Sequence, residues 1–103
     1  MTVEQLIFDI PPQFQSSFVE LDEQIWTPYL SSFAFFVSKE VWTCPANPSY
    51  LSIIVHWNSH AEWKSIPVDK LMELSREFDK LSQQKFGEVF AIKESRTYEV
   101  EKL

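Results

Sequence analysis

Six side chains in this sequence have the chemistry to move a proton or to hold a flat aromatic molecule. An imidazole titrates near neutral pH and serves as a general acid or base, and a carboxylate can take the same role. Indole rings stack on aromatic ligands. The candidate catalytic residues are His56 and Asp22, and the candidate ligand contacts are Trp26, Trp63, Arg96 and Tyr50. We expect His56, Trp26, Trp63 and Arg96 to lie near one cavity.

Each candidate also has a purely structural interpretation. His56 suits a position at a dimer seam, bonded to a carboxylate, and we favour that interpretation because perturbed groups are often structural. Asp22 lies one helical turn from Phe18 and from Trp26, on the flank of an apolar stripe. A buried, unpaired carboxylate is costly, so we expect Asp22 to lie at a rim or to pair with Lys39 or Arg96. The tryptophans more often fill core and interface.

Composition removes several classes of function. The formal net charge of −6 and the scattered Lys and Arg residues argue against nucleic-acid binding. With Gly87 as the only glycine, a dinucleotide fingerprint and a P-loop are impossible. The histidines do not form a convincing metal site, and no cofactor or metal is predicted.

The lone Cys44 cannot form an internal disulfide, which suits a reducing compartment. No apolar run approaches a membrane span, so we expect a cytoplasmic protein without membrane contact.

The central element that must position these residues is a strand from Tyr50 to Trp57. This run is rich in β-branched and aromatic residues, and prolines precede it. Alternation puts one set of its residues on a wholly apolar face, namely Leu51, Ile53, Val55 and Trp57. The other face is mixed and carries Tyr50, Ser52, Ile54 and His56. Directly afterwards, Ser59 and Glu62 have the spacing of a capping box, which predicts that a helix begins at once.

The remaining elements complete one domain over residues 1–103. Their order is β-α-β-β-α-β, the ferredoxin-like α+β pattern, in which an antiparallel sheet carries both helices on one face. Gly87 marks the end of the second long helix, where a left-handed residue is favoured. The predicted elements are a strand at Val3–Ile10, a helix from about Pro12 to Leu30, a strand at Phe33–Thr43, a short helix at Ala61–Ser65, a helix following Pro67, and a strand at Glu88–Val100.

Three motifs resemble a small family with no assigned reaction in the dimeric α/β-barrel superfamily. That superfamily includes antibiotic biosynthesis monooxygenases, haem-degrading monooxygenases and stress-responsive barrel proteins. The resemblance implies a homodimer in which two sheets form a barrel. The motifs are Asp22-x-x-x-Trp26-Thr27, Phe36-Val-Ser-Lys39-Glu40-Val41-Trp42, and Trp57 followed by Trp63-Lys64-x-Ile66-Pro67.

The resemblance also bears on the reaction. Haem-degrading members use an Asn on the first strand, a Trp after the third strand and a His on the second helix. Only Trp63 matches that set, so haem degradation is not expected. Cofactor-free, quinone-forming oxygenases use an Asn and a Trp, and this chain offers Asn58 and Trp63 for those roles.

Two functions follow. The first is a homodimer that binds a small hydrophobic, aromatic molecule and acts as a cofactor-free monooxygenase. In this reaction, His56 or Asp22 removes a proton from the substrate, and the resulting carbanion reacts with oxygen. The second is a non-catalytic dimer whose aromatic sheet face is only an interface. In both, the face away from the helices should be apolar enough to need a partner. Without a bulge, its residues are Ile7, Phe36, Trp42, Tyr50 and Ile54.

Overall fold

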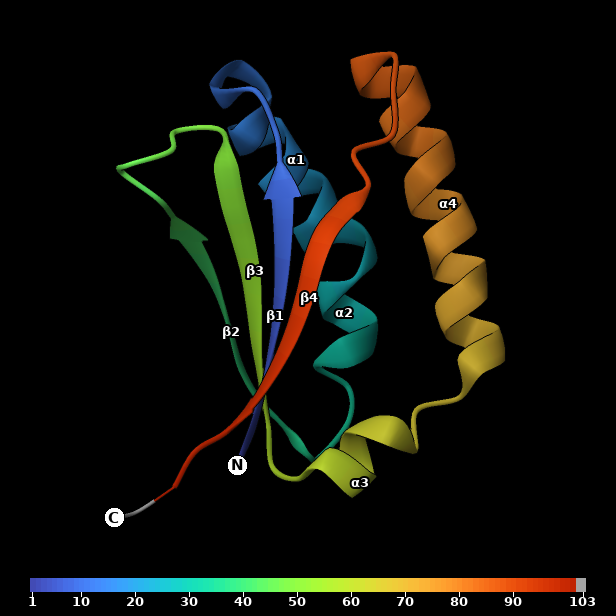
Figure 1. The fold of residues 1–103 in the computed structure, drawn as a ribbon. Coiled ribbons are helices and arrows are strands. Elements are labelled where there is room, and N and C mark those ends of the chain that lie inside the picture. Colours follow the sequence, from blue (N-terminus) through green and yellow to red (C-terminus); the bar gives the residue numbers. More distant parts are fainter. Residues whose placement is uncertain (102–103) are drawn as a thin grey trace.

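A computed structural model describes residues 1–101 and confirms the ferredoxin-like α+β fold. Four antiparallel strands form one sheet in the order β2-β3-β1-β4, and all helices cover one face of it (Figure 1). The elements are β1 (Thr2–Asp9), α1 (Pro12–Ile25), α2 (Thr27–Leu30), β2 (Phe36–Thr43), β3 (Tyr50–Trp57), α3 (His60–Lys64), α4 (Val68–Phe86) and β4 (Ile92–Glu99).

Strand β3 lies inside the sheet, between β2 and β1, as its apolar composition predicts. Its helix-facing residues are almost completely buried, and Trp57 is 0% exposed. Aromatic rings from three elements pack together in the core: Phe8 of β1, Phe18 of α1 and Phe78 of α4. The ring centroids are 5.0 Å apart for Phe8 and Phe18, and 5.6 Å apart for Phe18 and Phe78. Burial of this aromatic core is what holds the helices on the sheet.

The first helix is interrupted, whereas we predicted one helix from about Pro12 to Leu30, with a kink or a shortened last turn at Pro28. α1 ends at Ile25, and the short α2 begins at Thr27. Pro28 explains the break, because it has no N–H to donate to the carbonyl four residues earlier and its ring crowds that carbonyl. The interruption lies next to Trp26, which is the C-cap of α1.

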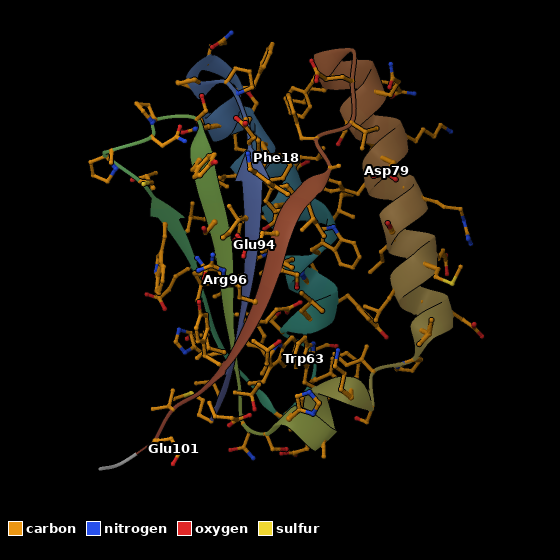
Figure 2. All side chains as sticks on the ribbon, viewed as in Figure 1. Phe18, Trp63, Asp79, Glu94, Arg96 and Glu101 are labelled. Atoms are coloured by element: carbon orange, nitrogen blue, oxygen red, sulfur yellow. The ribbon has the colours of Figure 1, made fainter. Side chains whose placement is uncertain are left out.

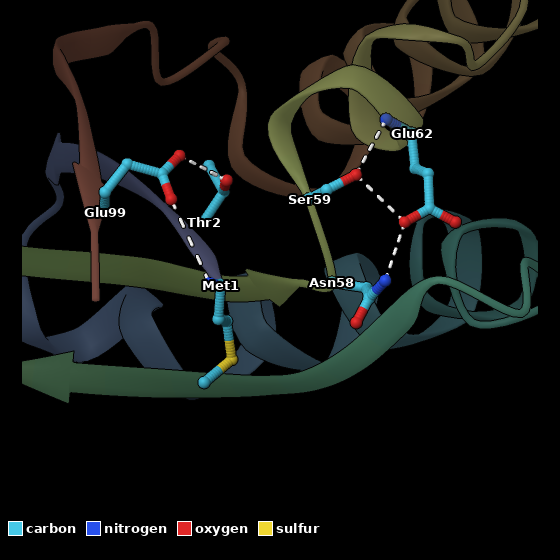
Figure 3. A network of polar contacts seen from close by, with 6 residues as sticks. All are labelled: Met1, Thr2, Asn58, Ser59, Glu62 and Glu99. Atoms are coloured by element: carbon cyan, nitrogen blue, oxygen red, sulfur yellow. Dashed lines mark hydrogen bonds and ion pairs between the residues drawn. The ribbon is translucent and has the colours of Figure 1, made fainter. Parts of the chain in front are cut away.

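The two predicted helix-end signals, Ser59 and Gly87, are confirmed, although the short helix spans His60–Lys64 and not the predicted Ala61–Ser65. The Ser59 hydroxyl accepts a hydrogen bond from the Glu62 amide at 3.2 Å, and the Glu62 carboxylate accepts from the Ser59 hydroxyl and from Asn58 (Figure 3). α3 therefore begins at His60. At the far end, Gly87 ends α4 with a φ of 76°, a left-handed conformation in which a side chain would be strained.

Two β-bulges change which face some residues occupy. In β2 an extra residue, Val37, places Phe36 on the helix side, with its ring 5.8 Å from Trp57. In β4 an extra residue, Lys93, places Ile92 and Tyr98 on opposite faces, although uninterrupted alternation would put both on one face. Each extra residue shifts the alternation by one. Both strands also begin later than predicted, at Phe36 and Ile92.

In the described part of the chain, no helix is long and apolar enough to cross a membrane.

Candidate binding cavity between sheet and helices

A cavity of about 600 Å³ lies between the helix-facing side of the sheet and the helices. This volume is in the range of small-molecule sites. The exposed part of its lining comes from α4 and from the segment leading into β4, so the cavity opens between these two elements. The exposed lining residues are Met72, Ser75, Asp79, Val89, Ala91 and Ile92.

Stacked tryptophans form one end of the cavity. Trp63 of α3 lies nearly parallel to Trp57 of β3, with centroids 6.2 Å apart and an interplanar angle of 8°. The Lys64 ammonium lies 4.0 Å from the centroid of the Trp63 ring, and His60 meets the same ring edge-on at 5.5 Å. Trp57 is covered and Trp63 is half-buried, so Trp63 and Trp26 are the indoles that a ligand can reach.

Asp22 and Lys39 form an ion pair in the cavity lining. Asp22 reaches from α1 to the Lys39 ammonium on β2, which also donates to the Thr27 hydroxyl at 2.9 Å. Burial raises the pKa of Asp22 above its ordinary value, and the neighbouring ammonium offsets only part of this effect. Of the two partners that we predicted for Asp22, Lys39 is confirmed and Arg96 is not.

Glu4 adds a second carboxylate to the lining, and we missed it in the sequence. It accepts a hydrogen bond from Trp57 Nε1 at 3.3 Å. Burial raises the pKa of Glu4 above its ordinary value, and the hydrogen bond from Trp57 and the charges of Lys64 and Lys39 offset only part of this effect. A signal for it existed: in the alternation of the first strand, Glu4 shares the apolar face of Leu6 and Phe8.

The structure does not bring the six predicted site residues together. Asp22, Trp26 and Trp63 line the cavity. His56, Arg96 and Tyr50 lie on the opposite face of the sheet, where Figure 2 shows Arg96 beside Glu94. The predicted single cavity that contains both His56 and Arg96 is therefore wrong. The sheet itself separates the two groups.

Each of these three residues, His56, Arg96 and Tyr50, has a partner in its own chain. His56 Nε2 lies 2.6 Å from a Glu40 carboxylate oxygen, which is the histidine–carboxylate contact that we favoured. Arg96 Nε donates to Glu94 at 2.7 Å. The ammonium of Lys93 lies 4.9 Å from the centroid of the Tyr50 ring.

Asn58 is also outside the cavity lining. Its amide donates to the Glu62 carboxylate at 2.7 Å, next to the start of α3. The pair of Asn58 and Trp63 therefore does not form a joint site in the cavity.

Comparison with known proteins supports the fold. No protein-family model and no curated protein sequence matches the chain. Among solved structures, SnoaB from Streptomyces nogalater, a cofactor-independent oxygenase, is similar with a TM-score of 0.66 and 9% identity, over 99% of this chain and 94% of its own.

Two further solved structures are similar in fold to this chain. A protein from Deinococcus radiodurans, provisionally named an antibiotic biosynthesis monooxygenase, has a TM-score of 0.65 and 12% identity over 100% of this chain and 95% of its own. A conserved protein from Methanosarcina mazei Go1 has a TM-score of 0.63 and 13% identity over 97% and 92%. The chain thus has the fold of antibiotic biosynthesis monooxygenase-like proteins.

Proposed function

We propose that this chain binds a small, flat, hydrophobic molecule in the cavity between the sheet and the helices. The observation that carries the proposal is an open, mostly apolar cavity of about 600 Å³ with the Trp57–Trp63 stack at one end. Apolar and aromatic surface of this kind gains free energy by releasing water when a ring enters. A few polar groups in the lining, Glu4 and the Asp22–Lys39 pair, would orient the ligand.

Closing the mouth tests this proposal. Ser75 is exposed and lines the opening on α4, so Ser75→Trp should obstruct it. Isothermal titration with naphthalene should show saturable binding to the unmodified protein and at least roughly tenfold weaker binding to this variant, a difference of about 1.4 kcal/mol. Ser16→Trp, on an exposed position of α1, is the matched control and should bind normally. Equal binding by both variants would contradict the location.

The finer function that we propose is cofactor-free monooxygenation of the bound molecule. A cofactor-independent oxygenase shares the fold, and Asp22 provides a buried carboxylate at the cavity. Because burial raises its pKa, ionised Asp22 is a stronger base than an exposed aspartate. It would remove a proton from an activated CH2 group, and the resulting carbanion would bond to O2 as the proton returns, giving a hydroperoxide. Loss of water from the hydroperoxide would leave a carbonyl group, so one oxygen atom enters the product and the other leaves as water. His56 cannot take this role in the cavity, because it lies across the sheet.

Oxygen consumption tests the reaction separately from binding. With a hydroxylated aromatic substrate, the protein should consume oxygen without added metal or cofactor, and Asp22→Asn should abolish the rate. Asp9→Asn removes a carboxylate on the far side of the sheet and should leave the rate unchanged. Tight binding without oxygen consumption would contradict the proposed catalysis and leave the proposed binding function standing.

We also propose a homodimer formed through the sheet face away from the helices. Trp42 and Tyr98 are 48% and 46% exposed there, which supports a covered interface. The face is less apolar than we predicted. Phe36 lies on the helix side, and Ile54 is 0% exposed within one chain, so neither contributes to an exposed patch.

A further inference from the structure

We propose that Glu4 determines the specificity of this cavity: its carboxylate accepts a hydrogen bond from a hydroxyl or amine group on an aromatic ligand and disfavours ligands that carry a carboxylate. This inference rests on the proposed binding function. It extends that function by naming the chemical class of the ligand, which we infer to be neutral or cationic with a polar hydrogen.

The position of Glu4 gives it access to the ligand while surrounding it with apolar residues. It lies on β1 in the helix-facing row with Leu6, opposite Val55 of β3. The same three residues line the cavity. A polar group in such a setting costs free energy unless a partner satisfies it.

Glu4 retains unused capacity to accept hydrogen bonds. Within residues 1–101, Trp57 Nε1 is its one hydrogen-bond donor, and the 3.3 Å separation is long for such a bond. An ionised carboxylate has room for about four donors. A ligand hydroxyl or amine in the cavity would therefore meet an acceptor that the fold leaves largely free.

The nearby cations do not neutralise Glu4 by direct contact. The Lys39 ammonium is engaged by Asp22 and Thr27, and the Lys64 ammonium lies over the Trp63 ring. Among residues 1–101, the cavity lining thus holds the carboxylates of Glu4 and Asp22, with Asp79 at the mouth, and a single ammonium, that of Lys39. A carboxylate ligand would meet net negative charge, and like charges in a partly desolvated site repel strongly.

Three matched probes test the inference: naphthalene, naphthol and naphthoate, the last two substituted at the same ring position. We expect the unmodified protein to bind naphthol about tenfold or more tighter than naphthalene, which is the effect of one hydrogen bond to a charged group. Naphthoate should bind more weakly than naphthalene. Glu4→Gln keeps the shape of the side chain and an acceptor for Trp57, but removes the charge.

We expect Glu4→Gln to change the affinities for naphthol and for naphthoate in opposite directions. Glu4→Gln should weaken naphthol several-fold and strengthen naphthoate, while naphthalene serves as the measure of an intact cavity. Glu20→Gln, the same substitution at an exposed position of α1, should leave all three affinities unchanged. A purely structural role for Glu4 would change all three affinities in the same direction.

The possible failures are distinguishable. If the unmodified protein binds the three probes equally, or if Glu4→Gln shifts all three together, the role of Glu4 is wrong while binding in the cavity stands. If none of the three probes binds, both the inference and the proposed binding function are wrong.

Discussion

Asp22 on α1 and Lys39 on β2 form an ion pair whose side chains are only 8% and 5% exposed. The pair joins the helix layer to the sheet at the cavity. Lys39→Met would leave Asp22 buried without its counter-charge, and we expect the free energy of unfolding to fall by about 3–5 kcal/mol. Chemical denaturation measures this loss.

The double variant Asp22→Leu/Lys39→Met is the control. Because it removes both charges and keeps apolar volume, it should recover most of the stability lost in Lys39→Met. A loss in Lys39→Met below about 1 kcal/mol, the size expected of an exposed pair, would show that the pair is not buried in solution.

The raised pKa of Glu4 predicts a pH-dependent effect on stability. A carboxyl whose pKa is higher in the folded than in the unfolded chain contributes stability below the unfolded pKa, and this contribution is lost as pH rises through the folded pKa. At a pH above the folded pKa, where Glu4 is ionised, Glu4→Gln should therefore melt at a higher temperature than the unmodified protein. The Lys39 and Lys64 charges near Glu4 reduce this gain without reversing it.

The gain from Glu4→Gln should disappear as the pH is lowered and Glu4 becomes protonated. Melting curves recorded across this range provide the measurement, with Glu20→Gln as the control for loss of an exposed charge. A gain that grows towards acidic pH would have the wrong sign and would contradict burial of an ionisable Glu4.

Trp63 should contribute to binding more than to folding. Trp63→Phe keeps a ring over Trp57 but shortens the wall of the cavity, so naphthalene affinity should fall several-fold, up to about tenfold. Trp42→Phe makes the same change on the far face and should not affect affinity. If Trp63→Phe lowers stability strongly and affinity only in proportion, Trp63 is core rather than ligand contact.

If the protein forms a homodimer, its melting temperature should depend on protein concentration. Binding of a second copy stabilises the folded state by mass action, so the melting temperature should rise as the protein is concentrated. Trp42→Glu places a charge at an exposed position of the proposed interface and should remove this dependence. Ile54→Glu is unsuitable, because Ile54 is buried within one chain. A well-folded monomer of unmodified protein at roughly micromolar concentration would contradict the dimer.

The parts of the fold with regular periodicity could be predicted from sequence. The β-branched and aromatic composition of β3 identifies it as a strand, and its register with β1 has no bulge. Ser59 and Gly87 place helix boundaries through local backbone chemistry that does not depend on distant contacts. The bulges at Val37 and Lys93 could not be predicted, because an extra residue in a strand depends on pairing with its neighbours.

The candidate site was predictable only in part. Asp22, Trp26 and Trp63 follow from their types and positions on helices, and they do line one cavity. Alternation along the central strand already separated His56 from the helix-facing side, so grouping it with Trp63 ignored a constraint present in the sequence. The shape of the cavity itself depends on how far α4 stands from β4, and no sequence pattern reports such a distance.

Indole resonances offer the most direct test of the central claim, because the four tryptophans divide between the two faces. In a nitrogen–proton spectrum, titration with naphthol should shift the indole signals of Trp26 and Trp63 saturably, since both line the cavity. Trp42, on the opposite face, should not move. Saturable shifts of Trp42 alone, with Trp26 and Trp63 unchanged, would place the ligand on the sheet face and contradict binding in the cavity.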